Sequence, residues 1–168
     1  GHAALFSNTT GGLNVAIGAS AMVSHRSGNN NTVVGTDAMF LDTTGVSNIA
    51  IGNQAMFNSR NTIGNIAIGT NALNNNRTGN AKLAIGTFTL FADTSAGPNT
   101  AIGNNSLVSN TKGQNNIAIG FSALRNNTVS SANMAIGDSA LFTQSFNNGG
   151  VSFSSGNTAV GYKTLFAN

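Results

Sequence analysis

Apolar and polar positions recur along this chain with a fixed period of seventeen residues. Glycine stands at every seventeenth position from Gly18 to Gly137, and Gly161 continues the series after an interval that is seven residues longer. Ile or Val precedes each of these glycines, and Leu or Met stands four residues after each. Repetition at a fixed, short period is typical of proteins that stack one unit on the next. We therefore expect a single repeat domain spanning residues 1–168, with coils that start near residues 14, 31, 48, 65, 82, 99, 116, 133 and 157.

A unit of seventeen residues is too short for a pair of helices, which takes about 33 residues or more in helical arrays. It suits two short strands with a turn after each. The segment Asn-x-Ala-Ile is the first expected strand, the glycine after it supplies a backbone conformation that other residues resist, and Ala-Leu-Phe begins the second. Stacked coils of this kind form an all-β, parallel β-solenoid. The residues we expect to define the structural repeat are Asn48, Ile51, Gly52, Asn65, Ile68, Gly69, Leu73, Ile102, Gly103, Leu107, Ile119, Gly120 and Leu124.

Two columns of the repeat carry specific expectations. Asn opens every coil except one, where Lys82 replaces it. Stacked Asn side chains can form an amide ladder between coils, although Asn also simply tolerates the turn that enters a strand. The Leu column holds ten apolar residues in register, from Leu5 to Leu165. Each buried Leu contributes about 1.5–3 kcal/mol, so this column predicts a continuous core.

Both faces of the expected strands are apolar, which predicts self-association. Side chains alternate across a strand, so Ile66 and Ile68 share one face while Ala67 points the other way. We expect Ile68 to be buried, so that a charge placed there would disrupt neighbouring coils. In the second strand Leu and Phe point in opposite directions. One face of each strand fills the coil, and the other packs most simply on copies of the same chain. The alternative is a wider monomeric core with Phe lying over the coil edges.

The composition restricts the function classes. Only 7% of residues are charged, Cys is absent, and the net charge of +3 is not concentrated in a basic run. These features argue against a nucleic-acid partner, and the absence of an 18-residue apolar stretch argues against membrane insertion by this segment. The two His and four acidic residues are scattered and are expected to be solvated turn residues. We therefore expect no enzyme activity, no catalytic or metal site and no cofactor.

The repeated Asn-x-Ala-Ile-Gly-x-x-Ala, seen at residues 48–55, resembles the head repeat of YadA-type trimeric autotransporter adhesins. It is also similar to fibre proteins of bacteriophages and predatory bacteria that use this repeat. The resemblance covers essentially the whole chain. It implies a left-handed parallel β-roll, three chains side by side in a homotrimer, and a role in attachment. The coils here are longer than in the best-known adhesin heads, and the Leu-Phe pair is closer to fibre and tail proteins.

Two features are candidates for ligand contact. Arg26, Arg60 and Arg77 occupy one column and would form a basic stripe suited to a sulfated or sialylated glycan, or a solubilising edge. The coil that starts at Asn133 carries seven extra residues within 142–156. Insertions in solenoids emerge as loops, often on the binding face. Phe146 and Phe153 in this insertion could contact a ligand, cap the core or clasp a neighbouring subunit.

These features together predict a structural or adhesive segment of an extracellular trimeric fibre, on a cell surface or a phage tail. Its partners would be further copies of itself and a surface receptor, glycan or matrix protein. One alternative is a monomeric ice- or carbohydrate-binding solenoid, although apolar residues interrupt the column that holds Thr32, Thr100 and Thr158. A hexapeptide-repeat acyltransferase fits poorly, because that fold needs three apolar corners in each coil.

Overall fold

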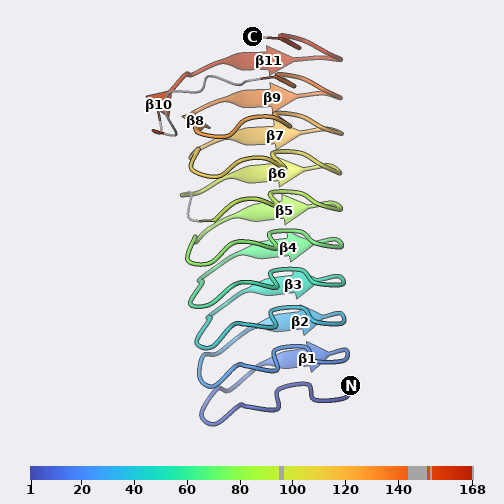
Figure 1. Cartoon of the computed structure of the whole chain (residues 1–168), viewed down its shortest axis with the longest axis vertical. Helices are drawn as coiled ribbons and strands as arrows, with labels where there is room; N and C mark the ends of the chain where they lie inside the picture. Colours follow the sequence, from blue (N-terminus) through green and yellow to red (C-terminus); the bar gives the residue numbers. More distant parts are fainter. Residues whose placement is uncertain (95–96, 144–150, 152, 168) are drawn as a thin grey trace.

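The computed structural model describes residues 1–94, 97–143, 151 and 153–167, and all of their regular secondary structure is β. Nine three-residue strands stack into one parallel sheet in the order β1-β2-β3-β4-β5-β6-β7-β9-β11 (Figure 1). These strands are β1 (Val15–Ile17), β2 (Thr32–Val34), β3 (Ile49–Ile51), β4 (Ile66–Ile68), β5 (Leu83–Ile85), β6 (Thr100–Ile102), β7 (Ile117–Ile119), β9 (Met134–Ile136) and β11 (Thr158–Val160). β8 (Ser130–Ser131) and β10 (Phe153–Ser154) form a second, two-stranded parallel pair. The predicted parallel β-solenoid is confirmed.

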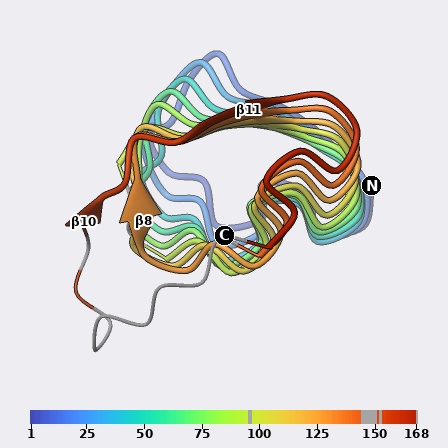
Figure 2. The ribbon, with the colours of Figure 1, turned by 90° about the horizontal axis from the view of Figure 1, so that it is seen from above.

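The register of the sheet follows the sequence repeat. Each strand pairs with the residues one repeat further along, as in Ile49 with Ile66 and Ala50 with Ala67. The extra seven residues after β9 are accommodated before β11, which pairs with β9 without a shift of column. Seen from the C-terminal end, the chain runs clockwise as it rises towards the viewer, so the solenoid is left-handed (Figure 2).

Each coil contributes one strand to the main sheet. The prediction of a second strand at Ala-Leu-Phe is wrong. This segment consists of consecutive turns in which every second residue has positive φ, such as Gln54 at 55° and Met56 at 53°. A strand would send neighbouring side chains to opposite faces. The left-handed conformation instead lets Ala55 and Met56 both point into the coil, where both are fully buried. The segment still bonds to the next coil, since Met56 N donates to Ala72 O at 2.9 Å.

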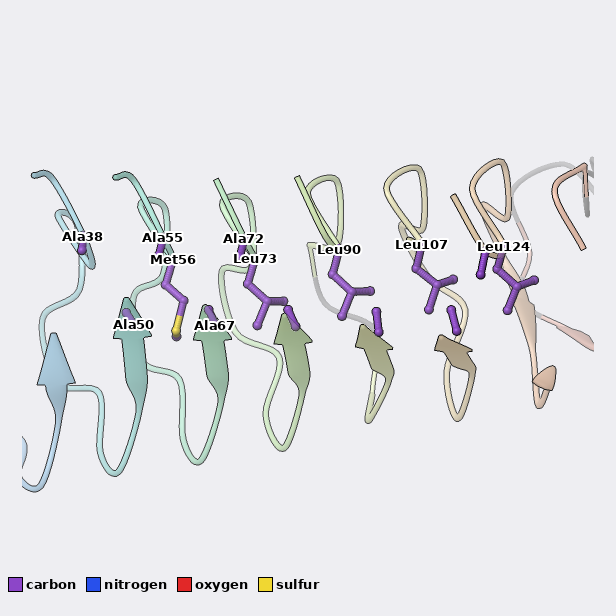
Figure 3. Packing of buried hydrophobic residues seen from close by; sticks show 14 of the residues in the cluster. Ala38, Ala50, Ala55, Met56, Ala67, Ala72, Leu73, Leu90, Leu107 and Leu124 are labelled. Atoms are coloured by element: carbon purple, nitrogen blue, oxygen red, sulfur yellow. The ribbon is translucent and has the colours of Figure 1, made fainter. Parts of the chain in front are cut away.

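The core lies between the Ala column of the strands and the Leu column of the turns (Figure 3). Ala67 is 0% exposed, whereas its neighbours Ile66 and Ile68 are only half-buried and point outward. The expectation that Ile68 is buried is therefore wrong. The interior is narrow, and the Leu or Met side chains already fill it, so the strand can contribute only a small residue. The Leu column is confirmed as the core, and eight of its members are fully buried, namely Met22, Met39, Met56, Leu73, Leu90, Leu107, Leu124 and Leu141.

The glycine that ends each strand is required by both backbone conformation and space. Gly52 has a φ of 134°, a region that L side chains rarely adopt. A Cβ on Gly52 would lie 2.6 Å from the backbone carbonyl carbon of Gly69 in the next coil. The close approach of stacked backbones at this corner therefore explains the glycine period.

The Asn column forms the predicted amide ladder inside the solenoid. The side-chain oxygen of Asn48 accepts from the backbone N–H of Asn65 at 3.0 Å. Its side-chain nitrogen donates to Thr62 O at 2.8 Å and to Asn31 Oδ1 at 3.2 Å. The ladder thus joins the start of each coil to the end of the same coil and to both neighbouring coils.

Replacing Asn48 with Ala is expected to lower the free energy of unfolding by about 1–3 kcal/mol, because it leaves the buried backbone N–H of Asn65 without a partner and removes one of the two hydrogen bonds that Thr62 O accepts. Urea denaturation followed by circular dichroism measures the loss. Asn53→Ala, at an exposed turn position, is the matched control and should change stability by less than about 0.5 kcal/mol. Equal effects of the two substitutions would contradict a structural role for the ladder.

The orientation of β4 predicts unequal effects of the same charge at adjacent positions. Ala67→Asp should lower the free energy of unfolding by about 3–5 kcal/mol, because it places an unpaired carboxylate in the closed interior. Ile68→Asp should retain the far-ultraviolet β spectrum, because that side chain points away from the coil. If Ile68→Asp lost the fold while Ala67→Asp kept it, the inward and outward faces of β4 would be the opposite of those described.

Candidate functional site

The outward side of the nine-stranded sheet is a continuous apolar surface, which we call the outer sheet face. It consists of the first and third residues of the strands β1 to β7, β9 and β11. Fifteen of these eighteen residues are apolar, and the other three are Thr32, Thr100 and Thr158. None is charged, and their exposure is substantial for large apolar side chains, as in Ile17 at 57% and Ile51 at 36%. Exposed apolar patches of this extent are typical of contact surfaces.

The three candidate arginines lie on a different edge of the coil, which we call the arginine edge. Arg26, Arg60 and Arg77 are all exposed. Thr43 occupies the same column between Arg26 and Arg60 and is half-buried. A surface hollow of about 300 Å³ lies among Arg26, Thr43 and Arg60, and Ser7, Ser24 and Leu41 complete its lining. The edge therefore offers cationic and hydroxyl groups side by side, which is a combination that binds anionic or hydroxylated ligands.

The insertion in the coil that starts at Asn133 is described in part. Phe153 belongs to β10, is half-buried and pairs with Ser130 of β8. Phe146 lies outside the described residues. The structure thus places Phe153 beside Ser130 of the preceding coil, and β10 lies next to β8 in Figure 2.

Stacked Phe side chains line the outward side of the turn segments. Phe40 and Phe57 lie in parallel with ring centroids 5.1 Å apart, and Phe142 and Phe166 do so at 4.9 Å. The prediction that Leu and Phe point in opposite directions is confirmed, because these rings stay partly exposed while the Leu column is buried. Such offset or parallel aromatic contacts add about 0.5–1.5 kcal/mol each beyond area burial.

A second polar column lies inside the solenoid, and sequence reasoning missed it. It runs through the turn that follows the Leu column and consists of Asn8, His25, Asp42, Ser59, Asn76, Asp93, Asn110 and Asn127. Asn110 and Asn127 each donate a side-chain hydrogen bond to the carbonyl three residues later. The sequence could have revealed this column, because its members are spaced by one repeat. Its residue types differ from coil to coil, however, so it is harder to recognise than the column of identical Asn residues.

The expectation that His25, Asp42 and Asp93 are solvated turn residues is wrong, because all three are fully buried. His25 Nδ1 lies 2.8 Å from Asp42 Oδ2, and both side chains are 0% exposed. Asp42 Oδ2 also accepts from the backbone N–H of Gly45 at 2.9 Å. His25 and Asp42 occupy positions that hold Asn or Ser in other coils. Their side chains therefore form hydrogen bonds inside the turn rather than on its surface.

Lys82, the exception in the Asn column, is also buried and pairs with an acid. Its Nζ lies 3.0 Å from Asp93 Oδ1, and both side chains are 0% exposed. Burial lowers the pKa of Lys82 and raises the pKa of Asp93, and the attraction between the two groups opposes both shifts. Desolvation therefore favours the neutral forms of both groups.

Among the residues that the structure describes, no three His, Cys, Asp or Glu side chains gather in a way that could hold a metal ion. The described residues also include no helix with the length and hydropathy needed to cross a bilayer. The groupings of titratable side chains that stand out in the described residues are the arginine edge, the His25–Asp42 contact and the Lys82–Asp93 ion pair.

The chain matches no protein-family model, no curated protein and no solved structure. The resemblance to the head repeats of YadA-type adhesins therefore remains a prediction from the repeat itself.

Proposed function

We propose that this chain is a structural and adhesive segment of an extracellular trimeric fibre. In this proposal the solenoid is a stiff spacer, three copies pack side by side through their outer sheet faces, and the arginine edge contacts a receptor, glycan or matrix protein. The observation that carries the proposal is the outer sheet face, which extends over all nine strands without a charged residue.

The chemistry of this face favours a partner that is equally apolar. Burying a charged or strongly polar partner surface against Ile and Val would leave its groups without hydrogen bonds, at a cost of about 1–3 kcal/mol each. A second copy of the same face avoids this cost. Burial of its Ile, Val and Leu side chains would instead contribute about 25 cal/mol for each Å² of apolar surface removed from water.

The period of the face also favours a second copy. Strands in a sheet are spaced by about 4.8 Å, so the outer sheet face is corrugated at that interval along its whole length. Only a partner with the same corrugation keeps its side chains in register over nine strands. Parallel copies related by a rotation axis along the fibre have this match, and such closed symmetry is usual in homo-oligomers.

The fibre assignment and its location rest on the resemblance of the repeat to adhesin heads and phage fibres. A cell-surface fibre and a phage tail fibre both need a stiff, protease-resistant rod with few charged groups. The left-handed parallel solenoid supports such a rod, because the sheet joins each strand to its neighbours over all nine strands and the buried Asn side chains add bonds between coils.

The alternative is a monomeric solenoid that binds ice or a carbohydrate through the flat outer sheet face. Ice binding would need regular Thr arrays, and here Thr32 and Thr100 are separated by apolar residues in the same column. Measured thermal hysteresis together with a monomeric mass would favour this alternative.

Static light scattering in solution is expected to give a mass three times the chain mass of 16.9 kDa. The double substitution Ile68→Asp and Ile102→Asp should release monomers that keep the β spectrum, because two repelling charges would enter each interface. Asn61→Asp is the control, since Asn61 is exposed on the turn side of the coil, and it should leave the trimer intact. A monomeric mass for the unsubstituted chain would contradict the proposed trimer.

Binding to immobilised heparin tests the arginine edge as an attachment surface. Replacing Arg60 and Arg77 together with Gln should lower the affinity roughly fivefold for each arginine, as expected for exposed ion pairs of about 1 kcal/mol. Arg125→Gln is the control, because its guanidinium lies over the Phe142 ring, 5.9 Å from the centroid, and outside the Arg column. Equal loss in the control would mean that binding depends on net charge rather than on this edge.

A further inference from the structure

The buried pair of Lys82 and Asp93 has no role in the proposed fibre that an Asn would not fill. Asn stands at the Lys82 position in the neighbouring coils, and Asn76 and Asn110 flank Asp93 in its own column. Burying an ion pair is costly, and replacing one by well-packed neutral groups is often stabilising. A pair of opposite charges in such a position therefore indicates chemistry beyond packing.

We propose that Lys82 and Asp93 form an autocatalytic modification site. In it, Nζ of Lys82 and Cγ of Asp93 condense to an intramolecular isopeptide bond, with release of one water molecule. The inference goes beyond the proposed fibre function and does not depend on it, because all of its groups lie inside one chain.

The geometry brings the reacting groups into contact. Lys82 Nζ lies 3.0 Å from Asp93 Oδ1, one bond from the carbon that it would attack. The amine is thus held directly against the carboxyl group, and such fixed proximity replaces the encounter that a reaction in solution would need. Lys82 Nζ also donates to Asn76 Oδ1 at 2.9 Å, which fixes the direction of the amine.

Two amides polarise the carboxyl group of Asp93. The side-chain nitrogens of Asn99 and Asn110 donate to Asp93 Oδ2 at 3.3 and 3.4 Å. They approach the oxygen opposite the one that faces the amine. Donors in this position stabilise negative charge on Oδ2 as the carbon becomes tetrahedral, as an oxyanion hole does.

The step balances without another reactant. A proton passes from the Lys82 ammonium to Asp93 Oδ1, which gives a neutral amine and a neutral acid. The Nζ lone pair attacks Cγ, and charge develops on Oδ2. A second proton then moves from Nζ to Oδ1, the bond between Cγ and Oδ1 breaks, and one water leaves. The product is a neutral amide whose remaining N–H still points at Asn76.

The buried setting favours both the reaction and the persistence of its product. Desolvation lowers the pKa of Lys82 and raises the pKa of Asp93, so the neutral pair that reacts is easier to reach than in water. The reaction removes two buried charges, and the released water escapes to the solvent. The closed interior then keeps water away from the amide, because both side chains are 0% exposed.

Intact-mass spectrometry of the purified chain in denaturant tests the proposal. The expected mass is below the sequence mass by one water. Trypsin should no longer cleave after Lys82, so residues 78–112 should be released as one peptide that is closed internally between Lys82 and Asp93 and is lighter by one water. Lys82→Asn, which restores the residue of the neighbouring coils, and Lys82→Arg should both show the full sequence mass. Asp93→Asn should lose one ammonia in place of one water.

Three results would overturn the proposal. The full sequence mass in folded, unsubstituted protein would show that the pair stays ionic. A loss of water that persists in Lys82→Arg would assign it to a cyclic imide at an aspartate. A loss of ammonia from the unsubstituted chain would assign the change to an asparagine, either by attack of Lys82 on Asn76 or by formation of a cyclic imide, and not to Asp93. The oligomeric state affects none of these masses, so failure here and failure of the fibre proposal are distinguishable.

Discussion

The buried amide at the start of each coil sets the register on which the rest of the structure depends. The side-chain oxygen of Asn48 accepts from the backbone of Asn65, and its nitrogen donates to the end of its own coil at Thr62. An unpaired amide in this interior would cost about 1–3 kcal/mol. A coil can therefore not slip in register without breaking several such bonds at once, and extra residues are accommodated only where the chain returns to the same columns. The longer excursion after β9 leaves this corner unchanged, because Asn157 N still donates to Asn133 Oδ1.

A fixed register makes the coil narrow, and the narrow coil determines which residues face inward. Leu or Met from the turn meets Ala from the strand, as Figure 3 shows for Leu73 and Ala67. The inward strand position holds Val33 in β2 and Ala in the other strands of the main sheet, while the Ile and Leu residues of these strands point outward. The same constraint that produces a closed core thus also produces an apolar outer sheet face, and stability of the single coil and a capacity for assembly arise from one packing arrangement.

The titratable side chains buried in the described interior occur in contacting pairs. His25 contacts Asp42, and Lys82 contacts Asp93, with all four side chains buried. Both acids lie in the column through the turns. His25 belongs to that same column, one repeat before Asp42, whereas Lys82 belongs to the Asn column. The Asn column bonds to the backbone of adjacent coils, whereas side chains of the column through the turns bond to the backbone of their own turn, as Asn110 does to Gly113 O. Reactive groups are thereby held in an interior that is otherwise made of amides and small apolar side chains.

The sequence alone determined the parallel solenoid, its period, the Asn ladder and the Leu core, because stacking places residues one repeat apart in contact and so turns composition directly into columns. Tertiary structure decided which face of each strand lies inside. Ala67 and Ile68 are both apolar, and only the width of the coil selects between them. Tertiary structure also decided that Ala55 and Met56 both point into the coil. The residue preferences favoured a strand here, but Met56 has a positive φ and the segment forms turns instead. The burial of Lys82 and Asp93 depends on distances across the coil, which a one-dimensional pattern does not contain.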